Sequence, residues 1–236
     1  PNLAIEVQAV LGAKGFAYDM SLACSSVTFA MMNAVGMIET NQAKCVLIVT
    51  PEIAGSQVDY TDRDSHFIFG DAATALMLEH KDSAKVKEGF SIIDSHLYTE
   101  FSNNIRTNFG FLNRVEKVGR EAKDMLFKQK GRKVFKEVCS MVPTHVKDQL
   151  KRLDIPPHKL KRLWLHQANL SMNEFIAKKI LGVSELTREQ VPIILDKYAN
   201  TASAGSIIAF HLHKEGFCEN DLGMICSFGA GYSLGS

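Results

Sequence analysis

The sequence predicts an α/β fold in which strands and helices alternate along most of the chain. Several predicted strands are almost continuously apolar, as expected for a sheet covered by helices on both faces. A helix-length segment near the N-terminus also carries apolar residues three and four positions apart, the spacing of one buried helix face. With 236 residues and 46% hydrophobic side chains, the chain can bury a sizeable core in one large domain or two modest ones.

The predicted strands are short runs rich in apolar and β-branched residues, bounded by turn-forming residues. They cover residues 16–22, 45–52, 74–79, 90–98, 162–167, 223–228 and 232–236. Helices are predicted between them. The helix that begins near Ser25 has apolar residues at 27, 30, 31, 34, 35 and 38. A second helix covers 170–181, with Asn169 as its N-cap and Gly182 past its end. A third runs from 203 to 215 and ends at Gly216.

The start of the chain carries a further helical pattern. Leu3, Val7, Val10 and Leu11 have helical spacing, and the first residue is Pro1 rather than methionine. We therefore expect the sequence to be a fragment that begins inside a helical part of a longer protein.

Composition excludes several classes of protein. A net charge of +1 gives no overall attraction to nucleic acid or to a membrane, and no apolar run reaches the length of a membrane helix. The five cysteines form no CxxC pair, which favours a reducing cytoplasm over a disulfide framework or a zinc site. His211 and His213 are two positions apart on a predicted helix and are poor joint metal ligands. We expect a cytoplasmic protein without a bound metal.

One segment is strongly basic. Between Asn113 and Lys136 there are nine Lys or Arg residues and three acidic residues. A solvated helical face explains this pattern, and so does a surface that binds an acidic protein partner. Both explanations stay open on charge alone.

Four features could carry chemistry. Cys24 lies at the first turn of a predicted helix, where unpaired N–H groups and the helix dipole favour a thiolate, although many cysteines are inert core residues. His166 follows a predicted strand, at the sheet edge where α/β proteins bind ligands, and a structural histidine fits there equally well. Asn200 precedes the third helix and is also a plausible cap. The turn around Ala230 is glycine-rich and can expose N–H groups to an anion.

Together, and in this order, these features resemble the β-ketoacyl-(acyl carrier protein) synthase III family of the thiolase-like superfamily. The motifs are "DMSLACSS" (19–26), "TDRDSHFIFGDAATA" (61–75), "WLHQANLSM" (164–172), "YANTASAGS" (198–206) and "SFGAGYSLG" (227–235). The resemblance implies an α-β-α-β-α layered sandwich. Residues 1–80 would be the remainder of an incomplete N-terminal half that carries the nucleophile, and residues 81–236 a complete C-terminal half.

The resemblance also implies roles for individual residues. The family's catalytic triad falls on Cys24 as nucleophile and on His166 and Asn200, and its oxyanion donors are the backbone N–H groups of Cys24 and Ala230. The implied reaction joins a primer acyl-CoA to malonyl-(acyl carrier protein) by decarboxylative Claisen condensation, with no cofactor beyond the CoA thioesters. The matching contacts with CoA or pantetheine are Arg63, Gly131 and Asn169, and those with the carrier protein are Lys136, Lys178 and Lys179. Family members are homodimers.

Other members of the superfamily fit less well. Degradative thiolases use a second cysteine in the glycine turn, where this chain has Ser227, and plant and polyketide synthases commonly carry a proline there. A non-catalytic subunit would have no need for the complete triad. His66 and Asp71 belong to a motif that we interpret as structural. The motifs do not distinguish acetyl, branched and medium-chain primers, and a chain without the opening part of the family could fold and still be inactive.

Overall fold

A computed structural model of the chain describes residues 1–84, 89–107 and 126–236. Its helices are α1 (Leu3–Leu11), α2 (Ser26–Glu39), α3 (Gly131–Arg152), α4 (Leu170–Leu181), α5 (Leu195–Tyr198) and α6 (Ala204–Leu212). Its strands are β1 (Cys45–Glu52), β2 (Ala72–Glu79), β3 (Leu97–Thr99), β4 (Ile105–Arg106), β5 (Lys128–Gln129), β6 (Leu160–Leu165), β7 (Leu222–Gly229) and β8 (Ser233–Gly235). Most of the basic stretch at 113–136 lies outside the described residues.

The strands form two main sheets. β1 and β2 pair antiparallel along their full length, from Cys45 opposite Glu79 to Glu52 opposite Ala72. The second sheet has the order β3-β8-β7-β6, in which β6 and β7 are parallel. A small ladder joins β4 to β5.

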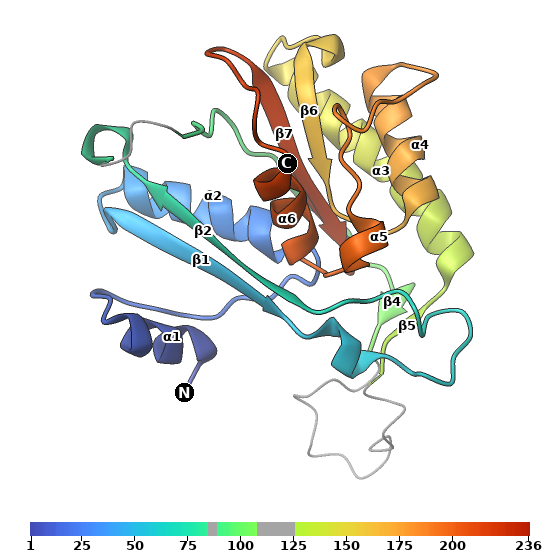
Figure 1. Cartoon of the computed structure of the whole chain (residues 1–236), viewed down its shortest axis with the longest axis horizontal. Helices are drawn as coiled ribbons and strands as arrows, with labels where there is room; N and C mark the ends of the chain where they lie inside the picture. The colour runs from blue at the N-terminus through green and yellow to red at the C-terminus, as the bar shows by residue number, and fades with distance from the viewer. Residues whose placement is uncertain (85–88, 108–125) are drawn as a thin grey trace.

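Helices α2 and α6 lie between the two sheets (Figure 1). The apolar face of α2 contributes Val27 and Ala34 to a core that also includes Ile48 of β1 and Ile207 of α6. Helices α3 and α4 pack together over the other face of β6 and β7, around buried residues such as Val142, Leu163 and Ile176. This arrangement covers β6 and β7 on both faces, which explains their nearly continuous apolar sequence.

Several predicted elements are confirmed. β1 has the predicted bounds. The bounds of β2, β6 and β7 differ from the prediction by a few residues, and α4 begins and ends where its caps predicted. The Asn169 side chain accepts a hydrogen bond from the Met172 N–H at 3.2 Å, and Gly182 takes the left-handed conformation at φ 70°. Local capping chemistry therefore fixed this helix.

Other predicted elements are wrong. Residues 16–22 form no strand beyond an isolated bridge, because the Asp19 carboxylate accepts the N–H groups of Leu3 and Ala4 at the start of α1. Of residues 90–98, only the last two belong to β3, and Phe90 packs edge-on against Trp164 instead. The long helix α3 was not predicted.

Helix α6 ends earlier than predicted. It stops at Leu212, because the carbonyl of the next residue, His213, accepts hydrogen bonds from Arg162 Nη1 and Trp164 Nε1. Long-range contacts of this kind leave no local sequence signal.

The predicted division at residue 80 stays a prediction. The strands on its two sides belong to different sheets, while α2 from the first part packs against Ile207 and Ile225 of the second. Within the described ranges, no helix combines the length and apolar character that a membrane crossing requires. The same part of the chain holds no cluster of three or more His, Cys, Asp or Glu side chains placed to bind a metal ion.

Candidate active site

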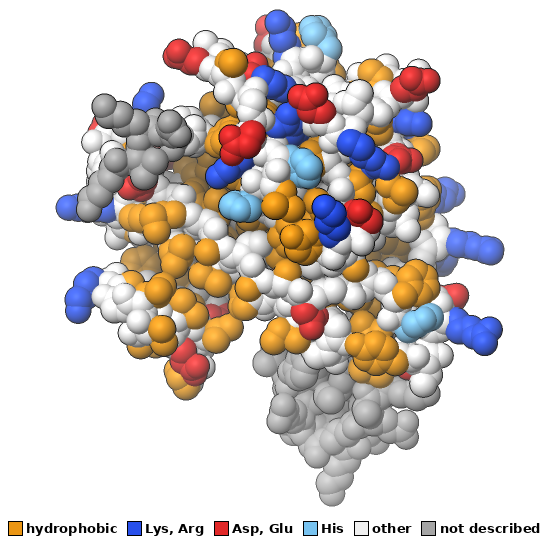
Figure 2. Space-filling view, viewed as in Figure 1, with side chains coloured by type: hydrophobic (Ala, Val, Ile, Leu, Met, Phe, Trp, Pro, Cys, Tyr) orange, Lys and Arg blue, Asp and Glu red, His pale blue; other side chains and the backbone are white. Residues whose placement is uncertain are grey.

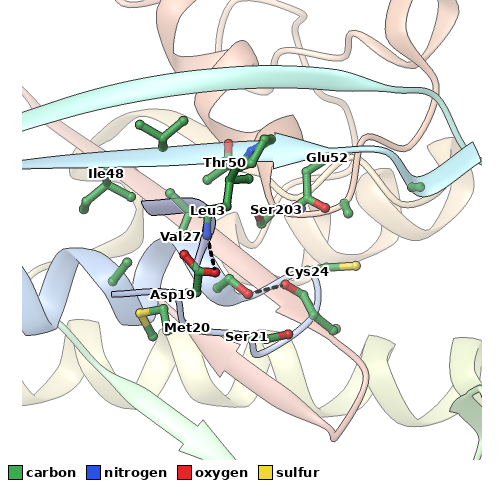
Figure 3. Close-up of a pocket in the computed structure, with 18 of the residues that line it drawn as sticks. Leu3, Asp19, Met20, Ser21, Cys24, Val27, Ile48, Thr50, Glu52 and Ser203 are labelled. Atoms are coloured by element: carbon green, nitrogen blue, oxygen red, sulfur yellow. Dashed lines mark hydrogen bonds between the residues drawn. The ribbon is translucent and has the colours of Figure 1, made fainter. Parts of the chain in front are cut away.

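A cavity of about 1790 Å³ lies at the carboxyl ends of β1, β6 and β7. Its lining includes Cys24, His166, Asn200 and Ala230, which come from four distant segments of the sequence. Residues of α1, α2 and β1 extend the cavity away from Cys24 (Figure 3). The tertiary structure thus brings the predicted triad and the predicted glycine turn to one cavity.

Cys24 lies just before α2, in a turn that is held on both sides. Ala23 has φ 48°, and the side chain of buried Ser25 donates a hydrogen bond to the Ser233 carbonyl at 2.7 Å. A Cβ atom at Gly229 would lie 2.8 Å from the Cβ of Cys24 and 2.9 Å from its backbone nitrogen. Glycine is therefore required at 229 for the end of β7 to pack directly against the nucleophile.

The expected ionisation of Cys24 is wrong for the free protein. Burial, followed by the negative charge of Glu52, raises the pKa of the Cys24 thiol to about 12, and the hydrogen bond from its own backbone N–H only partly opposes this. The dipole of α2 lowers the pKa of Cys24 only weakly, because the helix begins two residues later, at Ser26. The folded surroundings therefore favour the thiol form of Cys24 over the thiolate.

His166 is buried and neutral. Its backbone N–H donates to the Cys226 carbonyl at 2.7 Å, and its own carbonyl accepts from Asn173 Nδ2 at 3.0 Å. Burial lowers the pKa of the imidazole to about 4, although a hydrogen bond with the Ala202 backbone acts in the opposite direction. Nδ1 is buried without a hydrogen-bond partner, and the ring of Phe228 stands edge-on at 5.1 Å.

Asn200 is held by three hydrogen bonds. Its N–H donates to the Ile68 carbonyl and its carbonyl accepts from the Gly70 N–H, both at 3.0 Å. Its side-chain Oδ1 accepts the Ala202 N–H at 3.0 Å. The amide NH₂ group is thus the part of the side chain left to donate to a ligand. The N-cap of α6 is Ser203, so helix capping does not explain Asn200.

The positions predicted to contact CoA or pantetheine fall into two groups. Asn169 and Gly131 line the same cavity as the triad. Arg63 is exposed and does not line it, although Gln57 and Ile68, at either end of the Arg63 loop, do. The CoA contacts stay predictions.

The three lysines predicted to meet the carrier protein are exposed on two packed helices, Lys136 on α3 and Lys178 and Lys179 on α4. Between these helices, the rings of Phe135 and Phe175 lie 6.2 Å apart, and Lys179 Nζ sits 4.8 Å from the centre of the Phe175 ring. Phe135 also lines the cavity. Figure 2 shows basic side chains along the α3 and α4 edge, while apolar side chains gather over α1, β1 and β2.

Sequence reasoning missed Glu52 and Ser203, which both line the cavity. Glu52 ends β1, and its carboxylate accepts hydrogen bonds from the N–H and hydroxyl groups of Ser203. A charged residue at the carboxyl end of an apolar strand, as in "CVLIVTPE", was the available signal.

Known protein families match the segments of the chain that contain these motifs. The sequence profile of 3-oxoacyl-[acyl-carrier-protein] synthase III matches residues 18–100, and the profile of its C-terminal part matches residues 150–236. The chain belongs to the 3-oxoacyl-[acyl-carrier-protein] synthase III family. The predicted resemblance is therefore confirmed, and with it the acyltransferase class of the enzyme.

Relatives of this synthase III chain include a beta-ketodecanoyl-[acyl-carrier-protein] synthase of Pseudomonas aeruginosa, 51% identical over 236 residues, covering 100% of this chain and 67% of the relative. A beta-ketoacyl-[acyl-carrier-protein] synthase III of Granulibacter bethesdensis is 30% identical over 219 residues, covering 89% of this chain and 63% of the relative. The chain thus spans about two thirds of the length of these proteins.

Solved structures of the family share the fold. The synthase III of Thermus thermophilus matches with a TM-score of 0.83 at 26% identity, covering 100% of this chain and 71% of that one. The synthase III of Aquifex aeolicus matches with a TM-score of 0.81 at 26% identity, covering 98% of this chain and 70% of that one. These matches confirm the predicted thiolase-like α/β fold.

Proposed function

We propose that this chain carries the condensing site of a β-ketoacyl-(acyl carrier protein) synthase III that starts fatty acid synthesis. The observation that carries the proposal is the meeting of Cys24, a neutral buried His166 and the donor end of Asn200 in one cavity. A thiol nucleophile and two uncharged hydrogen-bond donors suit a reaction that acylates the protein and then stabilises an enolate.

The first step acylates Cys24. The sulfur attacks the thioester carbonyl of a primer acyl-CoA, the carbon–sulfur bond to CoA breaks, and the thiol proton ends on the departing CoA sulfur. The backbone N–H groups of Cys24 and Ala230 serve as donors to the tetrahedral oxyanion. The close packing of Gly229 on Cys24 supports this assignment, because it brings the turn before Ala230 against the nucleophile.

The second step lengthens the acyl group by two carbons. Malonyl-(acyl carrier protein) loses CO₂, and the enolate oxygen that forms accepts hydrogen bonds from His166 and Asn200. The enolate carbon attacks the acyl group on Cys24, and the Cys24 thiolate leaves to give the 3-ketoacyl thioester. Neither donor needs a charge, which agrees with the low pKa of His166.

We propose an eight-carbon primer. The Pseudomonas aeruginosa relative is named for a ketodecanoyl product, and a ten-carbon product needs an eight-carbon primer when malonyl supplies two carbons. Apolar residues such as Leu3, Val27 and Ile48 line the far end of the cavity and can cover an alkyl chain (Figure 3).

Lys136, Lys178 and Lys179 are the proposed contacts with the carrier protein. They lie on the two helices that carry Phe135 and Phe175, and Lys179 lies over the Phe175 ring, so an acidic partner docked there would deliver its pantetheine to a cavity that Phe135 lines. Arg63, Gly131 and Asn169 are the proposed CoA and pantetheine contacts, with no cofactor beyond the thioesters.

We also propose a cytoplasmic homodimer. The free state of all five cysteines supports a reducing compartment. Exposed apolar side chains on β1 and β2, such as Leu47 and Met77, support pairing with a second copy.

Intact-protein mass spectrometry tests the function. The chain is incubated separately with octanoyl-CoA and acetyl-CoA, beside Cys24→Ser as the control. We expect one octanoyl adduct that is absent from Cys24→Ser, and a weaker acetyl adduct. If iodoacetamide labels Cys24 while neither primer adds mass, acyl transfer by this chain is refuted.

A further inference from the structure

Glu52 brings a carboxylate into the cavity opposite the nucleophile. It ends β1, in a different sheet from the strands that precede His166 and Ala230, and its side chain is half-buried. Figure 3 shows Glu52 and Ser203 beside one another at the end of the pocket where the Cys24 sulfur lies.

The carboxylate is fixed by the turn that carries Asn200. Ser203, three residues after Asn200, is buried, and it donates both its N–H, at 3.2 Å, and its hydroxyl to Glu52 Oε1. Ala202, between them, has φ 47°, a conformation that costs a non-glycine residue energy. The two hydrogen bonds to Glu52 help to hold this strained turn in place.

We propose that Glu52 is a positioning residue of the condensing site, which clamps the Asn200 turn to β1 and presents a negative charge to the Cys24 sulfur. Its catalytic consequence rests on the function proposed above. The charge discourages a free thiolate before substrate arrives, and the clamp keeps the Asn200 amide aimed into the cavity.

Glu52 is singled out from the other titratable groups of the cavity. Those groups are Lys14, Tyr18, Asp19, Lys44, Cys45, Arg106 and His166. Glu52 is the group whose charge raises the pKa of Cys24, after burial itself. The Asp19 carboxylate is occupied by the N–H groups that begin α1.

The test separates the charge from the clamp. Glu52→Gln keeps an oxygen that accepts from Ser203 and removes the charge, whereas Glu52→Ala removes both. The alkylation rate of Cys24 by iodoacetamide is measured from pH 6 to 10, with peptide mapping to distinguish Cys24 from the other thiols. We expect Glu52→Gln to raise the rate at a given pH by about 3- to 10-fold, equivalent to a shift of about 0.5 to 1 pH unit in the profile.

Glu79→Gln is the matched control. Its carboxylate lies on β2 and, after partial burial, is the second cause that raises the pKa of Cys45, the residue opposite it in the ladder. This variant should speed alkylation of Cys45 and leave Cys24 unchanged.

The role of the Glu52–Ser203 hydrogen bonds is tested by measuring the melting temperature and the rate of malonyl-(acyl carrier protein) decarboxylation. Glu52→Ala should lower both, and Glu52→Gln should restore most of each. An unchanged Cys24 profile in Glu52→Gln would overturn the electrostatic role, and wild-type decarboxylation in Glu52→Ala would overturn the clamp. Alkylation needs no thioester substrate, so a failure of the proposed function would not affect that result.

Discussion

Gly229→Ala tests how tightly the end of β7 packs on the nucleophile. The new Cβ would lie 2.8 Å from Cys24 Cβ, 2.9 Å from Cys24 N and 3.2 Å from Cys24 Cα. Carbon atoms in contact settle about 3.5 to 4.0 Å apart, so the end of β7 and the nucleophile would have to separate by about 0.7 Å. Neither side offers a flexible side-chain end, because the contacts are Cβ and backbone atoms.

Two effects follow from this displacement. Overpacking of a well-packed site costs about 1 to 3 kcal/mol of unfolding free energy, which lowers the melting temperature of a chain of this size by about 2 to 12 °C. Moving reacting groups by nearly 1 Å can cost on the order of 100-fold in rate. We expect acylation of Cys24 to slow about 10- to 100-fold.

The assay follows the growth of the octanoyl adduct by intact mass, at a temperature where the variant is fully folded. Gly36→Ala serves as the control, because a Cβ at this α2 position meets no atom within 4 Å. This exchange should stabilise the protein by about 0.5 to 1 kcal/mol without changing acylation. Gly229→Ala acylating at the wild-type rate with an unchanged melting temperature would refute the packing argument.

Two further predictions concern the groups proposed to hold the enolate. Asn200→Ala should leave the rate of Cys24 octanoylation within about 3-fold of wild type. It should slow decarboxylation of malonyl-(acyl carrier protein), measured as released CO₂, by about 100- to 1000-fold. An equal loss of rate in both steps would instead indicate a structural role for Asn200. For His166, burial lowers the pKa from 6.5 in the unfolded chain to about 4 in the fold, so the unfolded state binds the proton first as the pH falls. Its contribution to stability is therefore complete above pH 6.5 and is lost between pH 6.5 and 4. The loss amounts to about 3 kcal/mol at most. Burial also lowers the pKa of His145 to about 4, so His166→Gln should reduce the slope of the denaturation midpoint against pH over that range without abolishing it, whereas an unchanged slope would contradict the assignment.

Some of the structure was decided by short sequence segments. The Asn169 cap, the Gly182 end and the apolar period between them define α4 without reference to other segments. The apolar run of β7 likewise predicts a strand, because its residue types fit a sheet covered by helices, whereas β1 alternates between exposed and more buried positions. The motifs around Cys24, His166 and Asn200 were enough to predict the family.

Only the tertiary structure decided what surrounds those residues. The sequence gives Cys24 a place before a helix, but the burial and the Glu52 charge that raise its pKa come from segments folded over it. Asp19 looks like part of a strand in the sequence and instead caps α1, a choice made by contacts 15 and 16 residues away. The partnership of Glu52 with Ser203 spans 151 residues, a separation that no local pattern records. Local sequence patterns thus determined individual helices, strands and motifs. The ionisation of the site residues and the orientation of their side chains depend on desolvation and on hydrogen bonds that exist only after folding.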